Sequence, residues 1–199
     1  MPPSAPPRRL RSILGHGFLR ATGWRATGEL DPGRKAVLVA APHTSNWDFL
    51  YMLAISSALD FPVHWIGKHT LFEGPLGGLL RRLGGISVDR RASHNAVEQV
   101  VAAFRNQSEF VLVIAPEGTR GRGKHWKTGF YYMALGAGVP MQLGFVDYKR
   151  KACGLGPVLV PSGDLAADMA VMRAFYRDVQ GKFPENATPV ELAEAKAAV

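Results

Sequence analysis

The fold is decided by the segment Ala36-Val-Leu-Val-Ala-Ala-Pro-His-Thr-Ser-Asn-Trp-Asp-Phe-Leu50. It begins with six consecutive apolar residues, continues with a short polar stretch, and leads into a helical pattern that extends to about Leu59. A continuous apolar run of this length is typical of a strand that is buried on both faces, as in a parallel sheet covered by helices. The segment therefore predicts a buried strand, a loop and a helix of an α/β protein.

Apolar strands and helical patterns continue to alternate along the chain as far as residue 179. Strands are predicted over 63–67, 86–88, 110–115, 141–146 and 158–160, and helices over 75–83, 95–104, 130–136 and 165–179. Strands that are separated by helices tend to lie parallel in one sheet. We therefore expect an α/β fold with a mixed, mostly parallel central sheet flanked by helices.

The chain of 199 residues, of which 47% are hydrophobic, is long enough to bury one sizeable core. Four prolines in the first seven positions disfavour both helix and strand there. The predicted organisation is a disordered lead-in over 1–9, an N-terminal amphipathic segment over 10–35, one globular domain over 36–183 and a C-terminal tail over 184–199.

Apolar residues keep rough helical spacing between Leu10 and Trp24, with arginines between them. Such a helix either lies at a membrane interface, with arginines on the lipid phosphates, or packs against the core of the protein. The sequence leaves both alternatives open. No apolar run approaches the roughly 20 residues that a membrane-spanning helix needs, so a spanning helix is not expected.

The formal net charge is +8, and seven of the 24 basic residues lie in the first 35 positions. A basic surface attracts nucleic acids, anionic lipid headgroups and acidic carrier proteins alike, so the charge limits the partners without selecting one. The single cysteine, Cys153, excludes an intramolecular disulfide and indicates a reducing compartment.

Two polar residues, His43 and Asp48, follow the first predicted strand, at the edge of the sheet where ligand sites of α/β proteins gather. With Ser45 as the N-cap of the next helix, Asp48 is its third residue and the His43 ring can fold back onto the carboxylate. A histidine oriented in this way can act as a general base. The alternative is that Ser45 and Asp48 only cap the helix.

A second polar segment, Glu117-Gly-Thr-Arg120, follows the most apolar predicted strand. The planar guanidinium of Arg120 suits a phosphate group, and the neighbouring glycine lets a ligand approach the backbone. The alternative is a solvated basic loop, because Arg122, Lys124 and Lys127 follow closely. A third segment ends a short strand in Asp89-Arg90, which alone is typical of a surface ion pair.

Taken in order, His43-x4-Asp48, Gly84…Asp89-Arg90 and Glu117-Gly-Thr-Arg120 resemble the motifs of the glycerolipid acyltransferase family, which includes 1-acylglycerol-3-phosphate acyltransferases. The resemblance extends over about residues 36–146. It implies a glycerol-3-phosphate acyltransferase-like fold, with 36–183 as the acyltransferase domain, His43 as the general base and Asp48 as its orienting carboxylate. It places the acceptor phosphate among Arg90, Glu117, Gly118, Thr119 and Arg120.

The stretch Gly67-Lys-His-Thr-Leu-Phe72 resembles a segment that the family places near the substrate, which makes Lys68 a further expected contact. The fourth motif of the family usually has a second proline, whereas here Val139-Pro-Met-Gln-Leu143 continues into Gly144. This departure leaves the identities of the acceptor and of the acyl chain open.

The resemblance implies transfer of a fatty acyl group from acyl-CoA or acyl carrier protein to a lysophospholipid hydroxyl, with 1-acylglycerol-3-phosphate giving phosphatidic acid as the expected reaction. A different lysolipid or a glycolipid is the alternative acceptor. No metal and no cofactor besides the thioester co-substrate is expected. The sequence has no Gly-x-Ser-x-Gly elbow, which favours direct transfer over an acyl-enzyme.

The expected partners are the lysophospholipid acceptor, the acyl-CoA or acyl carrier protein donor and an anionic membrane surface, with the protein peripheral on the cytoplasmic face. A basic nucleic-acid-binding module is the alternative from another class. It predicts exposed aromatic residues among the arginines, whereas the aromatic residues here fall mainly within apolar runs. No nucleic-acid partner is therefore expected.

Overall fold

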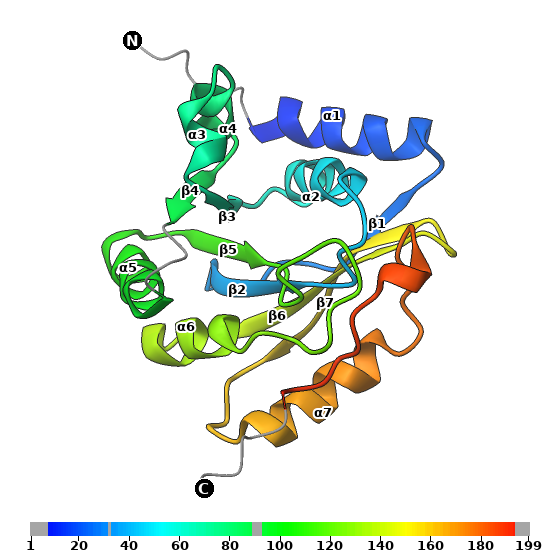
Figure 1. Ribbon diagram of the computed structural model, residues 1–199. Helices are drawn as coiled ribbons and strands as arrows, with labels where there is room; N and C mark the ends of the chain where they lie inside the picture. Colours follow the sequence, from blue (N-terminus) through cyan, green and yellow to red (C-terminus); the bar gives the residue numbers. More distant parts are fainter. Residues whose placement is uncertain (1–7, 32, 89–92, 194–199) are drawn as a thin grey trace, which may run out of the picture.

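The computed structural model describes residues 8–31, 33–88 and 93–193. Its centre is a seven-stranded sheet with the strand order β1-β7-β6-β2-β5-β3-β4 (Figure 1). β7 is antiparallel to β6 and parallel to β1, and the other four neighbouring pairs are parallel, which confirms the mixed, mostly parallel sheet. The strands are β1 (Arg25–Thr27), β2 (Lys35–Ala40), β3 (His64–Lys68), β4 (Gly85–Val88), β5 (Phe110–Ile114), β6 (Met141–Asp147) and β7 (Ala152–Leu159).

Helices cover both faces of this sheet (Figure 1). The helices on one face are α1 (Arg8–Ala21), α2 (Trp47–Ala58), α3 (Thr70–Glu73) and α4 (Gly77–Arg82). The helices on the other face are α5 (Ser93–Asn106), α6 (Gly129–Ala137) and α7 (Leu165–Tyr176). Among the described residues, the elements that were not predicted are the short β1, α3 and a 3-10 turn over Pro184–Asn186. Helix α1 begins at Arg8, so residues 8–9 of the predicted disordered lead-in are helical.

Successive residues of the central strands point to opposite faces of the sheet and build two hydrophobic cores. Val37, Val39 and Phe110 pack with residues of α5, α6 and α7, whereas Leu38 and Val111 pack with residues of α1 and α2. All five side chains are at most 4% exposed. Because both faces are buried, these strands need apolar residues at every position, which explains the continuous apolar runs in the sequence.

β7 is longer than predicted, because the expected strand covered only 158–160. It begins at Ala152, follows β6 through a short turn without an intervening helix, and pairs with β6 antiparallel. Gly154 in this strand has a φ of +147°, and a Cβ at this position would collide with the carbonyl group of Thr27. Glycine is unfavourable within strands, and Gly154 is required here. The sequence therefore did not indicate the first half of β7 as a strand.

Helix α1 packs against α2 through its buried residues Gly15 and Leu19. The Ser12 hydroxyl donates a hydrogen bond of 3.2 Å to the carbonyl oxygen of Ala58. Helix α1 therefore packs against the core of the protein, which is one of the two alternatives that the sequence left open. Its outer side nevertheless exposes four large apolar residues, which are Leu10, Ile13, Leu14 and Phe18.

The described part of the C-terminal tail also packs on the domain. The Trp126 backbone N–H donates a hydrogen bond of 2.8 Å to the carbonyl oxygen of Glu191, and Arg173 Nε donates one of 2.9 Å to that of Val190. Within the described residues, no helix combines the length and the apolar character that crossing a membrane requires. Residues 1–7, which form most of the predicted lead-in, and residues 194–199 lie outside the described residues.

The contact between α1 and α2 predicts opposite effects for alanine at two glycines of α1. A Cβ at Gly15 would lie 2.7 Å from the carbonyl oxygen of Ala54, whereas nothing outside the local helix backbone lies within 4 Å of a Cβ at Gly17. We expect Gly15→Ala to lower the free energy of unfolding by about 1 to 3 kcal/mol through overpacking. Gly17→Ala should raise it by up to ~1 kcal/mol, because alanine favours the helix.

Urea unfolding of the two variants and the wild type measures both effects. A Gly15→Ala variant that is as stable as the wild type would show that α1 does not pack closely on α2.

Candidate active site

Three loops meet at the carboxyl ends of the adjacent central strands β5, β2 and β6. The loop after β2 carries His43 and leads into α2, the loop after β5 carries Glu117, and the turn after β6 carries Tyr148. Hydrogen bonds join the three loops. The site therefore lies at the edge of the sheet where the sequence predicts it.

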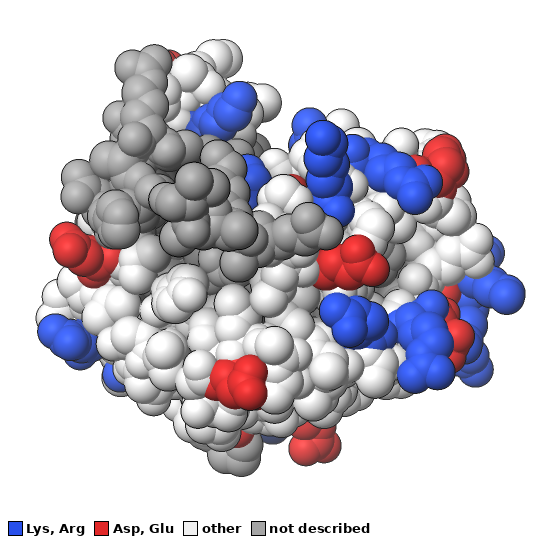
Figure 2. Space-filling view, turned by 60° about the horizontal axis from the view of Figure 1, so that its bottom comes forward, with Lys and Arg blue, Asp and Glu red and all other residues white. Residues whose placement is uncertain are grey.

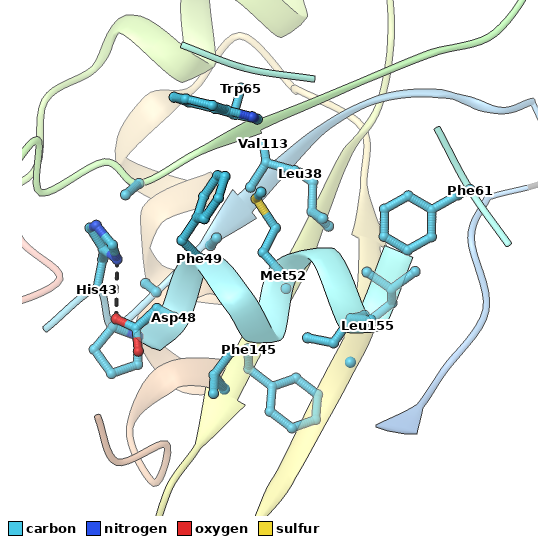
Figure 3. A pocket seen from close by; sticks show the side chains of 18 of the residues that line it. Leu38, His43, Asp48, Phe49, Met52, Phe61, Trp65, Val113, Phe145 and Leu155 are labelled. Atoms are coloured by element: carbon cyan, nitrogen blue, oxygen red, sulfur yellow. Dashed lines mark hydrogen bonds and ion pairs between the residues drawn. The ribbon is translucent and has the colours of Figure 1, made fainter. Parts of the chain in front are cut away.

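The His43 ring and the Asp48 carboxylate face each other, as expected from their spacing (Figure 3). The distance from His43 Nδ1 to Asp48 Oδ2 is 3.1 Å. Asp48 Oδ2 also accepts the backbone N–H groups of Thr44 and Ser45, both at 2.9 Å. Since a carboxylate oxygen only accepts, Nδ1 carries the ring proton and Nε2 is left as the basic nitrogen.

Helix α2 starts one residue later than predicted. Its N-cap is Asn46 and not Ser45, so Asp48 is the second helical residue rather than the third. Ser45 still supports the helix start, because its hydroxyl oxygen accepts the Trp47 backbone N–H at 3.2 Å. Asp48 lies in the first turn and complements the helix N-terminus while it holds His43, so the two interpretations of Asp48 are compatible.

Tyr148 is a site residue that the sequence did not indicate. Its hydroxyl donates a hydrogen bond of 2.7 Å to Asp48 Oδ1, and its ring packs edge-on against Trp24 and Tyr51. Burial, reinforced by the hydrogen bond to Asp48, raises the pKa of Tyr148, so its hydroxyl keeps the proton and remains a donor. The position of Tyr148 directly after β6 could have marked it as a site residue. The basic residues at 149–151, however, are typical of a solvated turn and pointed away from this interpretation.

Glu117 supports the same loop from β5, the neighbouring strand. Its side chain is 4% exposed, and its Oε1 accepts the backbone N–H of His43 at 2.9 Å. Its Oε2 has no hydrogen-bond partner among the described residues. Burial, opposed by the hydrogen bond from His43, raises the pKa of Glu117 to about 7. Near neutral pH this carboxyl group therefore exists in both protonation states.

The rest of this motif lies in an exposed loop. Gly118 has a φ of +64°, and the Lys127 side chain occupies the space where a Cβ of Gly118 would be. The Thr119 hydroxyl accepts a backbone N–H within the turn at 3.2 Å. Arg120 is exposed, and no ion pair joins it to Glu117 in the described part of the chain. The motif therefore supplies one buried carboxyl group and one exposed cation.

An apolar pocket of about 170 Å³ lies between α2 and the sheet (Figure 3). His43 and Asp48 lie at one end of it, and Phe61 and Leu155 lie at the other. Apart from His43 and Asp48, all of its lining residues are apolar or glycine. Residues that form its walls include Leu38, Phe49, Met52, Trp65, Val113 and Phe145.

A second hollow, open to solvent and about 510 Å³ in volume, borders the same loop at Thr44–Trp47. Arg120 and Lys182 also line it and supply positive charge. Basic residues are unevenly spread over the surface, since most Lys and Arg side chains of the face in Figure 2 gather toward its right. The loop that carries His43 therefore borders an apolar pocket and a basic hollow.

The two remaining predicted site residues are not brought to the His43 loop by any described contact. Lys68 is the last residue of β3, is exposed, and lines neither the pocket nor the hollow. Arg90 lies among residues 89–92, outside the described residues, and two strands separate β4 from β2. The roles of Lys68 and Arg90 stay predictions.

Fold and site together define an α/β protein with a histidine, held by a carboxylate, at one end of an apolar pocket. Residues 24–142 match the family model described as Acyltransferase, so the chain belongs to the acyltransferase family. This confirms the resemblance that the motifs indicated. No curated protein matches the chain.

Among solved structures, the chain is similar to the 1-acyl-sn-glycerophosphate (LPA) acyltransferase PlsC from Thermotoga maritima. The TM-score is 0.55 and the sequence identity 18%, and the match covers 85% of this chain and 77% of the other. At this identity the similarity establishes a shared fold.

The buried carboxyl group of Glu117 predicts a pH-dependent difference in stability. Because burial raises its pKa to about 7, the folded state binds the proton more tightly than the unfolded state does, and this stabilisation is lost as the pH rises toward 7. Glu117→Gln removes the titration and keeps an acceptor for the His43 N–H. Relative to this variant, the wild type should lose about 2 to 3 kcal/mol of unfolding free energy between about pH 5 and pH 8.

Urea unfolding of both proteins at these two pH values provides the measurement. If the stabilities of wild type and variant changed equally with pH, Glu117 would not titrate as a buried group.

Proposed function

We propose that this acyltransferase moves a fatty acyl group from an acyl thioester to the hydroxyl group of a lysophospholipid. The observation that carries the proposal is the His43 ring, which is oriented by Asp48 at 3.1 Å and lies at one end of an apolar pocket. The pocket suits the hydrocarbon chain of an acyl group, and the basic hollow on the same loop suits an anionic headgroup.

In the proposed reaction, His43 Nε2 removes the proton of the acceptor hydroxyl as its oxygen attacks the thioester carbonyl carbon. The new C–O bond forms, the C–S bond breaks, and the departing thiolate takes up the proton from His43. Asp48 keeps Nε2 available as the base and stabilises the imidazolium form that exists between the two proton transfers. Tyr148 and Glu117 hold Asp48 and the His43 backbone in place.

Direct transfer between the two bound substrates is favoured over an acyl-enzyme. Cys153 is buried in β7, and burial raises its pKa to about 12, so its thiol stays protonated. The reaction calls for no cofactor beyond the thioester, whether that is acyl-CoA or acyl carrier protein.

The acceptor that we propose is 1-acylglycerol-3-phosphate, with phosphatidic acid as the product. The motifs and the basic hollow beside the His43 loop support this choice, and the similar Thermotoga maritima protein is described as an LPA acyltransferase. Another lysolipid or a glycolipid is the alternative. A panel of acceptors with and without a phosphate group, tested against both thioester donors, distinguishes them.

His43→Ala should abolish thiol release from acyl-CoA in the presence of lysophosphatidic acid. Removal of a general base costs about 10² to 10⁴ in rate. His16→Ala is the matched control, because His16 is exposed on α1 and distant in sequence from the site. Circular dichroism checks that both variants fold, and wild-type activity in His43→Ala would rule out the mechanism.

We propose further that the enzyme binds an anionic bilayer from the cytoplasmic side, through the face that α1, α3 and α4 cover (Figure 1). Large apolar side chains are exposed on this face, among them Ile13 at 67%, Leu14 at 61% and Leu76 at 63%. Arg81 and Arg82 in the last turn of α4 supply positive charge beside them. Exposed apolar side chains with neighbouring basic residues are typical of interfacial helices.

Replacement of Ile13 and Leu14 together by serine should lower the partition coefficient on anionic liposomes by about tenfold or more, because two exposed apolar side chains can then no longer bury their surface among the acyl chains of the lipid. Leu135 and Val171, which are exposed on α6 and α7, are replaced by serine in the control. Liposome sedimentation measures binding, and equal binding of the two double variants would contradict the proposed face.

A further inference from the structure

Residues 180–186, which follow α7, pack against the loop that carries His43. The backbone N–H of Phe183 donates a hydrogen bond of 3.2 Å to the hydroxyl of Thr44, and the backbone N–H of Tyr148 donates one of 2.8 Å to the carbonyl oxygen of Gln180. Gly181 between them is buried, and a Cβ there would lie 2.6 Å from the Thr44 hydroxyl oxygen. This contact therefore needs a residue without a side chain, and it fixes the position of Lys182.

Lys182 is exposed and lies at the wall of the basic hollow. Its Nζ is 4.9 Å from the centre of the Trp47 ring and 5.8 Å from that of Phe183. An ammonium group near the faces of aromatic rings is attracted to them, so these rings favour one place for a flexible side chain. No ion pair holds Lys182 within the described part of the chain. The ammonium group is thus restrained and still has donors available.

Arg120 reaches the same hollow from the loop after β5. The two cations therefore come from segments 62 positions apart, and both border Thr44–Trp47, the part of the loop that directly follows His43. A phosphate monoester has enough oxygens to accept from an arginine fork and an ammonium group at once. The hollow combines the charge, the donors and the position that such a group requires.

We propose that Lys182 and Arg120 together bind the phosphate monoester of the acceptor in this hollow, so that Lys182 determines the preference for phosphate-bearing acceptors. The proposal rests on the proposed acyl transfer. It also assigns a substrate contact to a segment beyond the residues 24–142 that match the family model. His43 lines the apolar pocket and Thr44, the next residue, lines the hollow, so an acceptor whose phosphate is in the hollow has its hydroxyl group within reach of the His43 loop.

The test compares Lys182→Gln and Lys182→Arg with the wild type, in mixed micelles that contain either lysophosphatidic acid or the monoacylglycerol with the same chain. Arg105→Gln is the matched control, because Arg105 is an exposed basic residue of α5 that lines neither the pocket nor the hollow. For Lys182→Gln we expect the apparent KM for lysophosphatidic acid to rise about tenfold, since a charge-assisted hydrogen bond is lost. The kcat, the KM for acyl-CoA and the rate with monoacylglycerol should stay close to wild type.

Lys182→Arg should retain the wild-type KM, because it keeps the charge. Equilibrium dialysis with glycerol 3-phosphate gives a second measurement that does not depend on catalysis, and binding should weaken in both Lys182→Gln and Arg120→Gln. The KM values of the same variants for lysophosphatidic acid and for acyl-CoA show whether the hollow binds the phosphate of the acceptor or those of coenzyme A.

An unchanged KM for lysophosphatidic acid in Lys182→Gln would overturn the assignment, as would an equal rise in Arg105→Gln. A rise only in the KM for acyl-CoA would assign the hollow to the donor and also overturn the proposal. A wild-type protein that acylates neither acceptor, yet binds glycerol 3-phosphate through Lys182, would instead contradict the proposed function and leave the phosphate site in place.

Discussion

The site depends on the Asp48 carboxylate and the four hydrogen-bond donors around it. One oxygen accepts from the His43 ring and from two backbone N–H groups, and the other accepts from Tyr148. A buried carboxylate is costly unless its oxygens find donors, and here the donors come from the loop after β2 and from the turn after β6. The same interactions that satisfy the buried carboxylate thus also fix the start of α2, the loop that carries His43 and the tautomer of its ring.

The two carboxyl groups of the site, Asp48 and Glu117, lie in different environments and hold different parts of His43. Asp48 is surrounded by donors and orients the ring, whereas Glu117 has one donor and a second oxygen without a described partner. Burial consequently raises the pKa of Glu117 into the range of physiological pH. Glu117 thus holds the backbone of this loop at His43, and Asp48 holds the His43 ring.

The sequence predicts those parts of the fold and site that depend on local pattern. Continuous apolar strands follow from burial on both faces of the sheet, and the His43–Asp48 contact follows from a helix that begins between the two residues. The contacts of Tyr148 with Asp48 and of Phe183 with Thr44 were not predictable, because the partners are about 100 and 140 residues apart in the sequence. The shift of the N-cap from Ser45 to Asn46 was likewise beyond reach, since both residues are good N-caps.

The packing of Gly181 against Thr44 and the hydrogen bond from the Tyr148 backbone N–H to the Gln180 carbonyl oxygen have a consequence for the order in which this loop is assembled during synthesis. Residues up to Arg120 emerge from the ribosome before residues 148 and 180–183, so a nascent chain can carry His43, Asp48 and Glu117 before all the segments that pack around them have been made. The loop that carries His43 therefore gains its full set of contacts only after residues 180–183 have been made.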